Sequence, residues 1–347
     1  MSSRSWFGKA LRRWYAADHR DLPWRGTRDP YAIWLSEVLL QQTRVDQGLR
    51  YYQRFLERFP AVEDLAAARE DEVLRLWQGL GYYSRARNLL TAARQVVSAH
   101  GGHFPRTHAG LLALKGVGDY TAAAIASIAF DVPEPVVDGN VYRVLARVFG
   151  IDTPIDSTAG RRTFLELATT LMPRKHPGDH NQAVMELGAT ICTPKAPDCA
   201  HCPLHGKCIA RREGRVDRLP VKQGRTKVRD RHFHFGVVRR AGTIWVEKRG
   251  LRDIWAGLYA PPLIESGADL DARTFLEHWN EGHRGSGWRV KERFGPVRHL
   301  LSHQRLHITF WELVPPKGAR PPAGIRAVTR AALEQLALPR PIERYFQ

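Results

Sequence analysis

The chain is poor in cysteine and in long apolar runs. Its four cysteines among 347 residues are too few for a small secreted disulfide scaffold. No apolar run approaches the roughly 18 residues of a membrane-spanning helix. The N-terminal residues Trp6, Phe7, Leu11 and Trp14 recur at helical spacing, which indicates an amphipathic helix of the fold rather than a targeting peptide. We therefore expect a cytoplasmic protein, nucleoid-associated if bacterial, with reduced thiols and no membrane partner.

Acidic residues are also scarce relative to basic ones. The chain has 35 Asp and Glu against 53 Lys and Arg, which gives a formal net charge of +18. Such an excess favours a polyanionic partner, with nucleic acid as the first candidate. An anionic membrane or solubility alone would also account for the charge, but for no other feature of the sequence.

All four cysteines fall within seventeen positions. Cys192, Cys199, Cys202 and Cys208 have the spacing C-x6-C-x2-C-x5-C. Four thiolates suit either zinc or an iron-sulfur cluster. Structural zinc sites usually pair two short C-x2–4-C knuckles, whereas this run has one, so we expect a single 4Fe-4S cluster and keep zinc as the alternative. Two disulfides are a weaker alternative.

The length and the 43% hydrophobic content are sufficient for more than one domain. From residue 31 to about 210, apolar residues recur at helical spacing between Gly and Pro breaks, which predicts a series of short helices. A charge-rich stretch at 213–230 is a linker candidate. Beyond it, strand-like runs at 232–238, 243–247 and 299–314 and a helical run at 331–338 predict a mixed α and β domain.

A turn between two helical stretches resembles a helix-hairpin-helix. Leu111, Leu112 and Leu114 precede the turn, and helical composition resumes at Tyr120. The turn contains Lys115, Gly116, Val117 and Gly118. Its glycines permit tight backbone geometry, so that amide groups at the start of the second helix can point at a DNA phosphate. The alternative is an ordinary turn between helices.

Two carboxylates occupy contrasting sequence environments. Glu37 has Ile33, Trp34 and Leu40 as helical neighbours, which favours burial, a raised pKa and a role as proton donor. An ordinary exposed helix charge is the alternative. Asp138 lies where a helix is expected to begin, so it is first of all an N-cap, a position that stabilises the anion. A pair with pKa values pushed apart can supply both a general acid and an anionic stabiliser for glycosidic bond cleavage.

Together these motifs resemble one family, the adenine DNA glycosylases of the MutY type within the endonuclease III superfamily. The resemblance covers nearly the whole chain. It is carried most specifically by residues 22–24, 34–43, 79–89, 116–118, 137–141 and 181–188, the last leading into the cysteines.

The resemblance implies a multidomain fold and its boundaries. A mostly α-helical glycosylase domain spans 1–212. It comprises a six-helix module at 31–135, with the helix-hairpin-helix at 111–130, and an iron-sulfur module at 1–30 and 136–212. The linker at 213–230 is followed by a Nudix-like α+β recognition domain at 231–347. This second domain lacks the glutamate-rich Nudix box, so we expect no pyrophosphate hydrolysis.

The resemblance also implies site roles. Glu37 protonates N7 of a flipped adenine, Asp138 stabilises the sugar cation or a covalent adduct, and Tyr120 and Asn140 support Asp138. Tyr120 occupies the position of the Schiff-base lysine of bifunctional relatives, so we expect no efficient strand cleavage. Other matched positions in contact with bases or DNA are Trp24, Arg25, Gln42, Tyr82, Gln182, Leu301, Ser302 and His303. Leu301 departs from the family's Phe-Ser-His loop, which puts the wedge contact of that loop in doubt.

The expected substrate is double-stranded DNA with adenine opposite 8-oxoguanine or guanine, bound by a monomer. Glycosylases of other mismatches or of oxidised pyrimidines are alternatives within the same class. A DNA-binding regulator that uses the cluster without chemistry is an alternative of another class, but it leaves the Glu37 and Asp138 pair unexplained.

Overall fold

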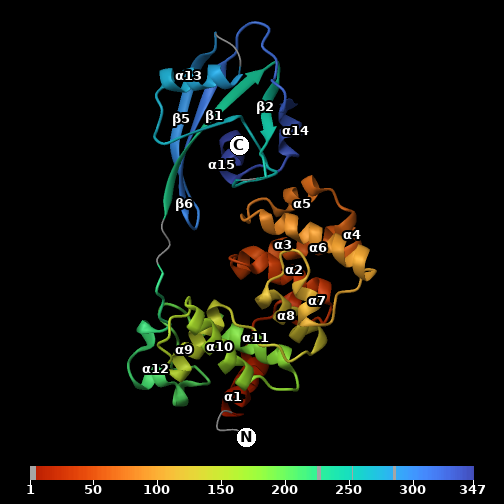
Figure 1. The fold of residues 1–347 in the computed structure, drawn as a ribbon, viewed down its shortest axis with the longest axis vertical. Coiled ribbons are helices and arrows are strands. Elements are labelled where there is room, and N and C mark those ends of the chain that lie inside the picture. Colours follow the sequence, from red (N-terminus) through yellow and green to blue (C-terminus); the bar gives the residue numbers. More distant parts are fainter. Residues whose placement is uncertain (1–4, 225–227, 252, 284–286) are drawn as a thin grey trace. The chain divides into compact units, whose positions relative to one another are not determined.

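The computed structural model describes residues 5–224, 228–251, 253–283 and 287–347 (Figure 1). It divides into two compact units, one of residues 1–67 and 88–224 and the other of residues 68–87 and 225–347. The division after Gly224 lies inside the stretch expected as a linker, whose residues 225–227 fall outside the described part, as do residues 1–4.

The first unit is helical. Its helices are α1 (Ser5–Asp18), η1 (Pro23–Arg25), α2 (Pro30–Leu40), α3 (Val45–Arg58), α4 (Val62–Ala67), most of α6 (Ser84–His100), α7 (His108–Leu112), α8 (Asp119–Phe130), α9 (Gly139–Phe149), α10 (Thr158–Leu171), α11 (Pro177–Thr190), η2 (His205–Lys207), α12 (Ile209–Arg212) and η3 (Val216–Arg218).

Helices α2 and α8 are buried on nearly all sides and pack against each other. Both are apolar around the whole circumference, which is typical of a helix inside a core rather than on a surface. The Asp29 side chain caps α2 by accepting the backbone N–H groups of Tyr31 (3.0 Å) and Ala32 (3.2 Å), and Pro30 occupies the first helical position. Any polar side chain on α2 is therefore placed in the interior.

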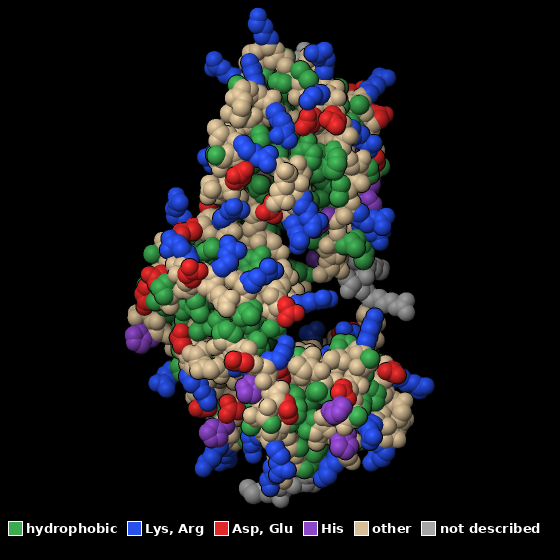
Figure 2. Space-filling view, turned by 180° about the vertical axis from the view of Figure 1, so that it is seen from behind, with side chains coloured by type: hydrophobic (Ala, Val, Ile, Leu, Met, Phe, Trp, Pro, Cys, Tyr) green, Lys and Arg blue, Asp and Glu red, His purple; other side chains and the backbone are tan. Residues whose placement is uncertain are grey.

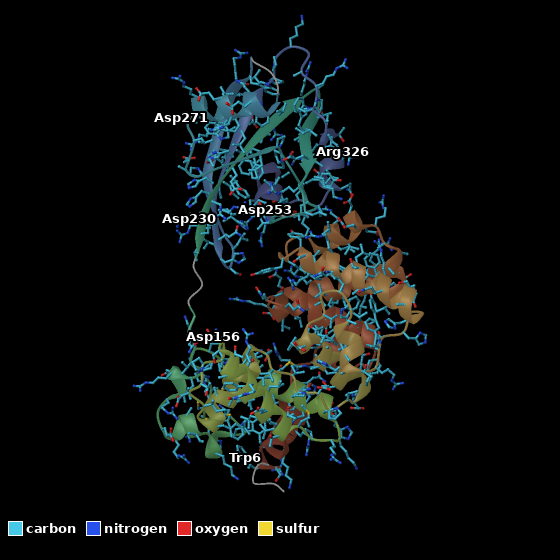
Figure 3. All side chains as sticks on the ribbon, viewed as in Figure 1. Trp6, Asp156, Asp230, Asp253, Asp271 and Arg326 are labelled. Carbon is cyan, nitrogen blue, oxygen red and sulfur yellow. The ribbon has the colours of Figure 1, made fainter. Side chains whose placement is uncertain are left out.

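A second core joins the N-terminal helix to the segment before the cysteines. Phe7 and Leu11 of α1 are fully buried against apolar residues of α9, α10 and α11. The amphipathic N-terminal helix predicted from the sequence is thus confirmed. At the end of this unit, the Asp156 carboxylate accepts the backbone N–H groups of Gln223 and Gly224, both at 2.9 Å (Figure 3).

In its described residues, the second unit contains a seven-stranded sheet, α5 (Glu70–Trp77), the start of α6, and three further helices. The strands are β1 (Arg229–Arg240), β2 (Thr243–Lys248), β3 (Tyr259–Ala260), β4 (Leu263–Ser266), β5 (Arg289–Leu300), β6 (Gln304–Val314) and β7 (Ile325–Thr329), and the helices are α13 (Ala272–His283), α14 (Arg330–Glu334) and α15 (Arg340–Phe346). The main path is β3-β2-β1-β6-β5, with β4 paired to β1 and β7 to β2; β1 and β6 are parallel.

The two faces of this sheet carry different helices. Trp311 of β6 stacks on Phe275 of α13, whereas the preceding residue Phe310 stacks on Tyr345 of α15. Because successive strand residues point to opposite faces, α13 and α15 cover opposite sides of the sheet. Arg231 of β1, nearly buried, binds Asp253 (2.7 Å) and Glu265 (2.6 Å) (Figure 3).

The expected fold class, helices followed by an α+β part with a sheet, is confirmed. The strand-like region at 299–314 contains the end of β5 and all of β6, with a loop at 301–303 between them. The helical run at 331–338 ends early, at Glu334 of α14. Lys and Arg side chains are spread over the visible face of both units, with fewer Asp and Glu (Figure 2). In the part that the structure describes, no helix has the length and apolar character needed to cross a membrane.

Candidate active site

Several of the residues singled out from the sequence line one cavity of the first unit. Its lining includes three of the expected base contacts and the four residues expected at the chemistry: Trp24, Arg25, Gln182, Glu37, Tyr120, Asp138 and Asn140. Segments far apart in the sequence, η1, α2, α8, α9 and α11, therefore meet at this cavity.

Glu37 is a buried acid at the cavity wall. Its side chain comes from the core helix α2 and is 9% exposed. Burial raises its pKa to about 7, and the nearby Asp138 charge also raises it, while the hydrogen bond from the Tyr120 hydroxyl (2.6 Å to Oε2) lowers it. A carboxyl group with such a pKa holds a proton near neutral pH and can donate it.

Asp138 is the N-cap of α9. Its Oδ1 accepts the backbone N–H of Val141 and its Oδ2 accepts the side-chain amide of Asn140, both at 2.8 Å. The N-cap position led us to expect a carboxylate stabilised as the anion, but burial raises the pKa of Asp138 and outweighs these hydrogen bonds and the charge of Arg143. Two donors nonetheless fix the orientation of its oxygens, whereas Glu37 is held by the Tyr120 hydroxyl.

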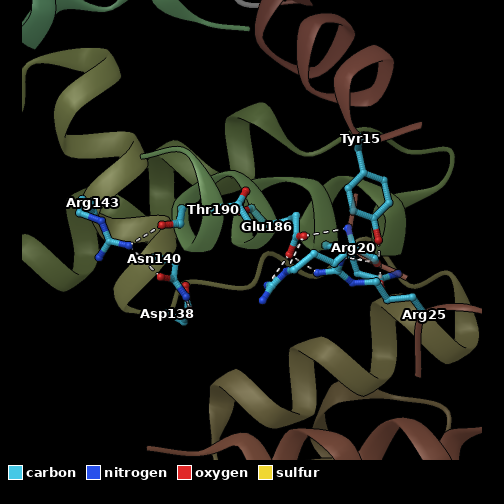
Figure 4. Close-up of polar contacts among 10 residues, drawn as sticks. Tyr15, Arg20, Arg25, Asp138, Asn140, Arg143, Glu186 and Thr190 are labelled. Carbon is cyan, nitrogen blue, oxygen red and sulfur yellow. Dashed lines mark hydrogen bonds and ion pairs between the residues drawn. The ribbon is translucent and has the colours of Figure 1, made fainter. Parts of the chain in front are cut away.

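A buried arginine connects Asp138 to the segment before the cysteines (Figure 4). Arg143 Nη2 donates to Asn140 Oδ1 (2.8 Å) and to the Gly188 carbonyl (2.7 Å), and its Nε donates to the Cys192 carbonyl (2.6 Å). Because Asn140 in turn donates to Asp138, the guanidinium fixes the amide orientation that Asp138 requires. No sequence pattern had selected Arg143.

A buried ion-pair cluster on the cavity wall was also missed. Glu186 of α11 is fully buried and is paired with Arg20 (2.7 Å) and Arg25 (Figure 4). Burial raises its pKa, but the bonds from the two guanidinium groups outweigh burial and lower it to about 2. Glu186 therefore stays anionic and lines the same cavity as the protonatable Glu37. The sequence did offer a way to find Glu186, because it lies four residues after Gln182 and therefore on the same helix face.

The expected hairpin lies between α7 and α8. Gly116 has a φ of 77°, and an added Cβ would lie 2.6 Å from the Cβ of Asn88. Gly118, the N-cap of α8, has an ordinary φ of −99°, and nothing lies within 4 Å of an added Cβ. Lys115 is exposed and Val117 is buried. The fold thus requires glycine at 116 but leaves open space at 118.

The four cysteines line one pocket next to α9 and are free thiols. Among the described residues, no group of three or more Cys, His, Asp or Glu side chains is arranged to hold a single metal ion. All four thiols nevertheless border the same space, so a group bound there could be reached by each of them.

A buried cation adjoins this cavity. Arg147 is 2% exposed, and its Nη1 donates to Cys192 Sγ (3.4 Å) and to the Thr193 carbonyl (2.7 Å). Its remaining donors bind backbone carbonyls, and within the described residues it has no carboxylate partner. A buried charge is costly without an opposite charge nearby, so the surroundings of Arg147 fit an anionic occupant such as a thiolate-bound cluster.

The remaining predicted contacts lie elsewhere. Gln42 and Tyr82 have φ values of 56° and 47°, a conformation that non-glycine residues adopt rarely and that often marks functional sites. Within the second unit, the Tyr82 hydroxyl hydrogen-bonds to Ser302. Ser302 and His303 are exposed at the β5–β6 loop, and Leu301 is half-buried.

Comparison with known proteins assigns both parts of the chain. Residues 35–168 match the family described as HhH-GPD superfamily base excision DNA repair protein, and residues 234–347 match the NUDIX domain. The structure is similar to that of a thermostable thymine-DNA glycosylase, with a TM-score of 0.55 and 33% identity over 60% of this chain and 95% of that one.

Two curated relatives are both named adenine DNA glycosylase. The protein of Mus musculus is 48% identical over 65% of this chain, but the match spans only 45% of that longer protein. The protein of Buchnera aphidicola subsp. Schizaphis graminum is 32% identical over 87% of this chain and 86% of its own length. On this near full-length match, the chain belongs to the adenine DNA glycosylase family.

Proposed function

We propose that this protein is a DNA glycosylase that removes adenine mispaired with 8-oxoguanine or guanine and leaves an abasic site. The observation that carries the proposal is the buried Glu37, with a pKa of about 7, on the same cavity wall as Asp138. One acid and one oriented carboxylate are what cleavage through an oxocarbenium-like state requires.

The chemistry divides between the two carboxyl groups. Adenine leaves the duplex, which costs a few kcal/mol of stacking and pairing, and enters the cavity. Glu37 donates its proton to N7, so that the base departs as a neutral molecule. Asp138 stabilises the positive charge that develops on the sugar, or forms a transient adduct, before water attacks C1′. Tyr120 and Asn140 orient the two carboxyl groups. With tyrosine at position 120, no amine forms a Schiff base and the strand stays intact.

The second part of the proposal concerns recognition. Gln42 and Tyr82 enter the duplex around the opposite base, while Ser302 and His303 contact 8-oxoguanine; Leu301 gives a weaker wedge than an aromatic residue. Trp24, Arg25 and Gln182 line the adenine pocket. The protein acts as a monomer on duplex DNA. The proposed domain boundaries are 1–212 for the glycosylase domain, 213–230 for the linker and 231–347 for the recognition domain.

The cysteines are the proposed ligands of one 4Fe-4S cluster. When bound, the cluster cross-links the loop from Cys192 to Cys208, and Arg147 supplies positive charge beside it. We expect Cys199→Ser to lose the visible absorbance and most of the folded protein together, because the loop then lacks one of its four attachments. Absorbance spectra and soluble yield measure the two losses.

His201→Ala is the matched control for Cys199→Ser, because His201 lies in the same loop and its side chain is 81% exposed. It should keep both the absorbance and the yield. A stable, colourless and fully active Cys199→Ser protein would contradict the structural role of the cluster.

The hairpin glycines give a matched pair of variants. We expect Gly118→Ala to keep the stability of the protein but to weaken duplex binding, because the added methyl group occupies the space through which a phosphate approaches the start of α8. Gly116→Ala should instead destabilise the fold, because of its positive φ and the contact with Asn88. Thermal unfolding and duplex titration separate the two effects. If Gly118→Ala bound the duplex with unchanged affinity, the hairpin would not be part of the DNA interface.

The proposed activity is tested by incubating the protein with duplexes that carry adenine opposite 8-oxoguanine, adenine opposite guanine, or thymine glycol. We expect strand breaks at adenine only after hot alkali. Breaks at thymine glycol without alkali would indicate a bifunctional enzyme, and the absence of breaks would favour a DNA-binding regulator.

A further inference from the structure

Two loops of the second unit border one pocket, which we call the two-loop pocket. One loop is the segment 253–256, and the other is the turn 301–304 between β5 and β6. A hydrogen bond from the Leu301 N–H to the Gln304 carbonyl (2.8 Å) closes this turn. Ser302 and His303, the residues that we propose contact 8-oxoguanine, lie inside the turn and line the pocket. The separation of the two loops therefore sets the shape of the pocket.

Arg231 of β1 ties the two loops together. Its side chain is only 8% exposed. Nη1 donates to Asp253 Oδ1 (2.9 Å) and to Gln304 Oε1 (3.0 Å), and Nη2 donates to Asp253 Oδ2 (2.7 Å). Nε and Nη2 bind the two oxygens of Glu265 (2.7 and 2.6 Å). All five N–H donors of the guanidinium group are thus used, and they join the first residue of one loop to the last residue of the other.

Strand pairing brings these side chains to one face of the sheet. Arg231 pairs with Leu306 across the parallel strands β1 and β6, and Gln304 lies two residues before Leu306. Phe233, two residues after Arg231, pairs with Glu265 of β4. Because residues two apart on a strand point to the same face, Arg231, Gln304 and Glu265 share a face. The register of three strands therefore fixes the position of the guanidinium group.

The loop 253–256 needs such an anchor. Trp255 has a φ of 59°, a conformation that a bulky residue keeps only where its surroundings hold it. Its ring packs edge-on against Phe233, with the centroids 5.8 Å apart. Two residues earlier, Asp253 is bound by Arg231 and also by Arg249, whose Nη2 donates to Oδ2 (3.3 Å). The two guanidinium groups hold the start of the loop in place.

We propose that Arg231 is a positioning residue for lesion recognition, which sets the separation of the two loops and thereby the preference for 8-oxoguanine over guanine. The inference rests on the proposed function. The two bases differ in the oxygen at C8 and the hydrogen at N7, so discrimination depends on polar groups placed with good hydrogen-bond geometry. Lysine cannot replace Arg231, because an ammonium group has three donors and cannot bind two carboxylates in a bidentate manner together with an amide.

The first test compares adenine excision opposite 8-oxoguanine and opposite guanine. Arg231→Lys removes the five-bond pattern, whereas Gln304→Met removes only the bond to the turn and keeps both ion pairs, which makes it informative even if Arg231→Lys folds poorly. We expect each variant to lower the ratio of the two kcat/KM values about tenfold, the effect of about one lost hydrogen bond. The single-turnover rate at saturating enzyme on adenine opposite guanine should stay unchanged, because Glu37 and Asp138 are not disturbed.

The second test is independent of activity. Hydrogen exchange should become faster in peptides that contain 253–256 and 301–304 in both variants, because the link between the loops is weakened. Arg239→Lys is the matched control. Arg239 also lies on β1 and binds a carboxylate, that of Glu312 (3.1 Å), at the far end of the strand from both loops. It should keep the exchange and the selectivity of the parent protein.

The outcomes separate this inference from the proposed function. Unchanged exchange in both loops, unchanged selectivity despite faster exchange, or an equal fall of kcat/KM on both duplexes would each overturn the positioning role of Arg231. A parent protein that excises adenine from neither duplex would instead overturn the proposed function, and this inference with it.

Discussion

Replacing Glu37 by Gln should reduce the single-turnover rate of adenine excision by about 10²–10⁴-fold, the usual contribution of a general acid. The amide has nearly the same size as the carboxyl group. Its carbonyl oxygen can still accept the hydrogen bond that the Tyr120 hydroxyl donates to Oε2 of Glu37 in the parent protein. Duplex binding should therefore remain near that of the parent protein. The measurement is the rate of alkali-dependent breaks with enzyme in excess over the duplex.

The same residue predicts how the rate depends on pH. Because the pKa of Glu37 is raised to about 7, the group is protonated below that pH and loses its proton as the pH rises through it. The excision rate should therefore fall on the alkaline side of about pH 7. Glu166→Gln on the surface of α10, where the carboxylate is 71% exposed, is the matched control and should leave the rate and its pH profile unchanged.

Glu37→Gln should also stabilise the protein above neutral pH. The unfolded state ionises Glu37 near its ordinary pKa of 4.5, whereas the folded state does so near 7. The folded state binds the extra proton in this window, so its stability falls as the pH rises from 4.5 to 7, by up to about 3 kcal/mol from this group. Glutamine does not ionise, so the variant does not lose this stability as the pH rises. A Gln variant that is inactive and less stable at about pH 8 would instead indicate a structural role for Glu37.

Much of the site could be predicted because its signals are local. Glu37 is conspicuous in a helix whose neighbours are nearly all apolar, and Asp138 precedes a helix start. The cysteine run needs only spacing. In each case the chemistry follows from a few adjacent positions, so the sequence alone was sufficient to select the residue.

The parts that could not be predicted depend on contacts between distant segments. Arg143 matters only because Asn140, Gly188 and the Cys192 carbonyl meet around it. The strand β5 was missed because its residues are largely charged and exposed, and the bulge interrupts the alternation that identifies a strand. The raised pKa of Asp138 likewise depends on burial by other helices, which outweighs its cap position.

Asp138 has two roles to separate, because its side chain both caps α9 and faces the candidate active site. Asn is about as good an N-cap as Asp, and its carbonyl oxygen can keep the bond from the Val141 N–H. We therefore expect Asp138→Asn to change the free energy of unfolding by no more than about 1 to 2 kcal/mol, chiefly through the altered contact with Asn140.

Excision should nevertheless fall by about 10²–10³-fold in Asp138→Asn, since the charge that we propose stabilises the sugar cation is gone. The alkaline limit of the remaining activity should move to lower pH, because the Asp138 charge helps to raise the pKa of Glu37. Asp271→Asn makes the same change at another residue whose carboxylate accepts a backbone N–H (Thr274, 2.8 Å) and should leave excision intact (Figure 3). If Asp138→Asn excised adenine at the parent rate, the carboxylate would be a helix cap alone, and Glu37 would have to act without an anionic partner.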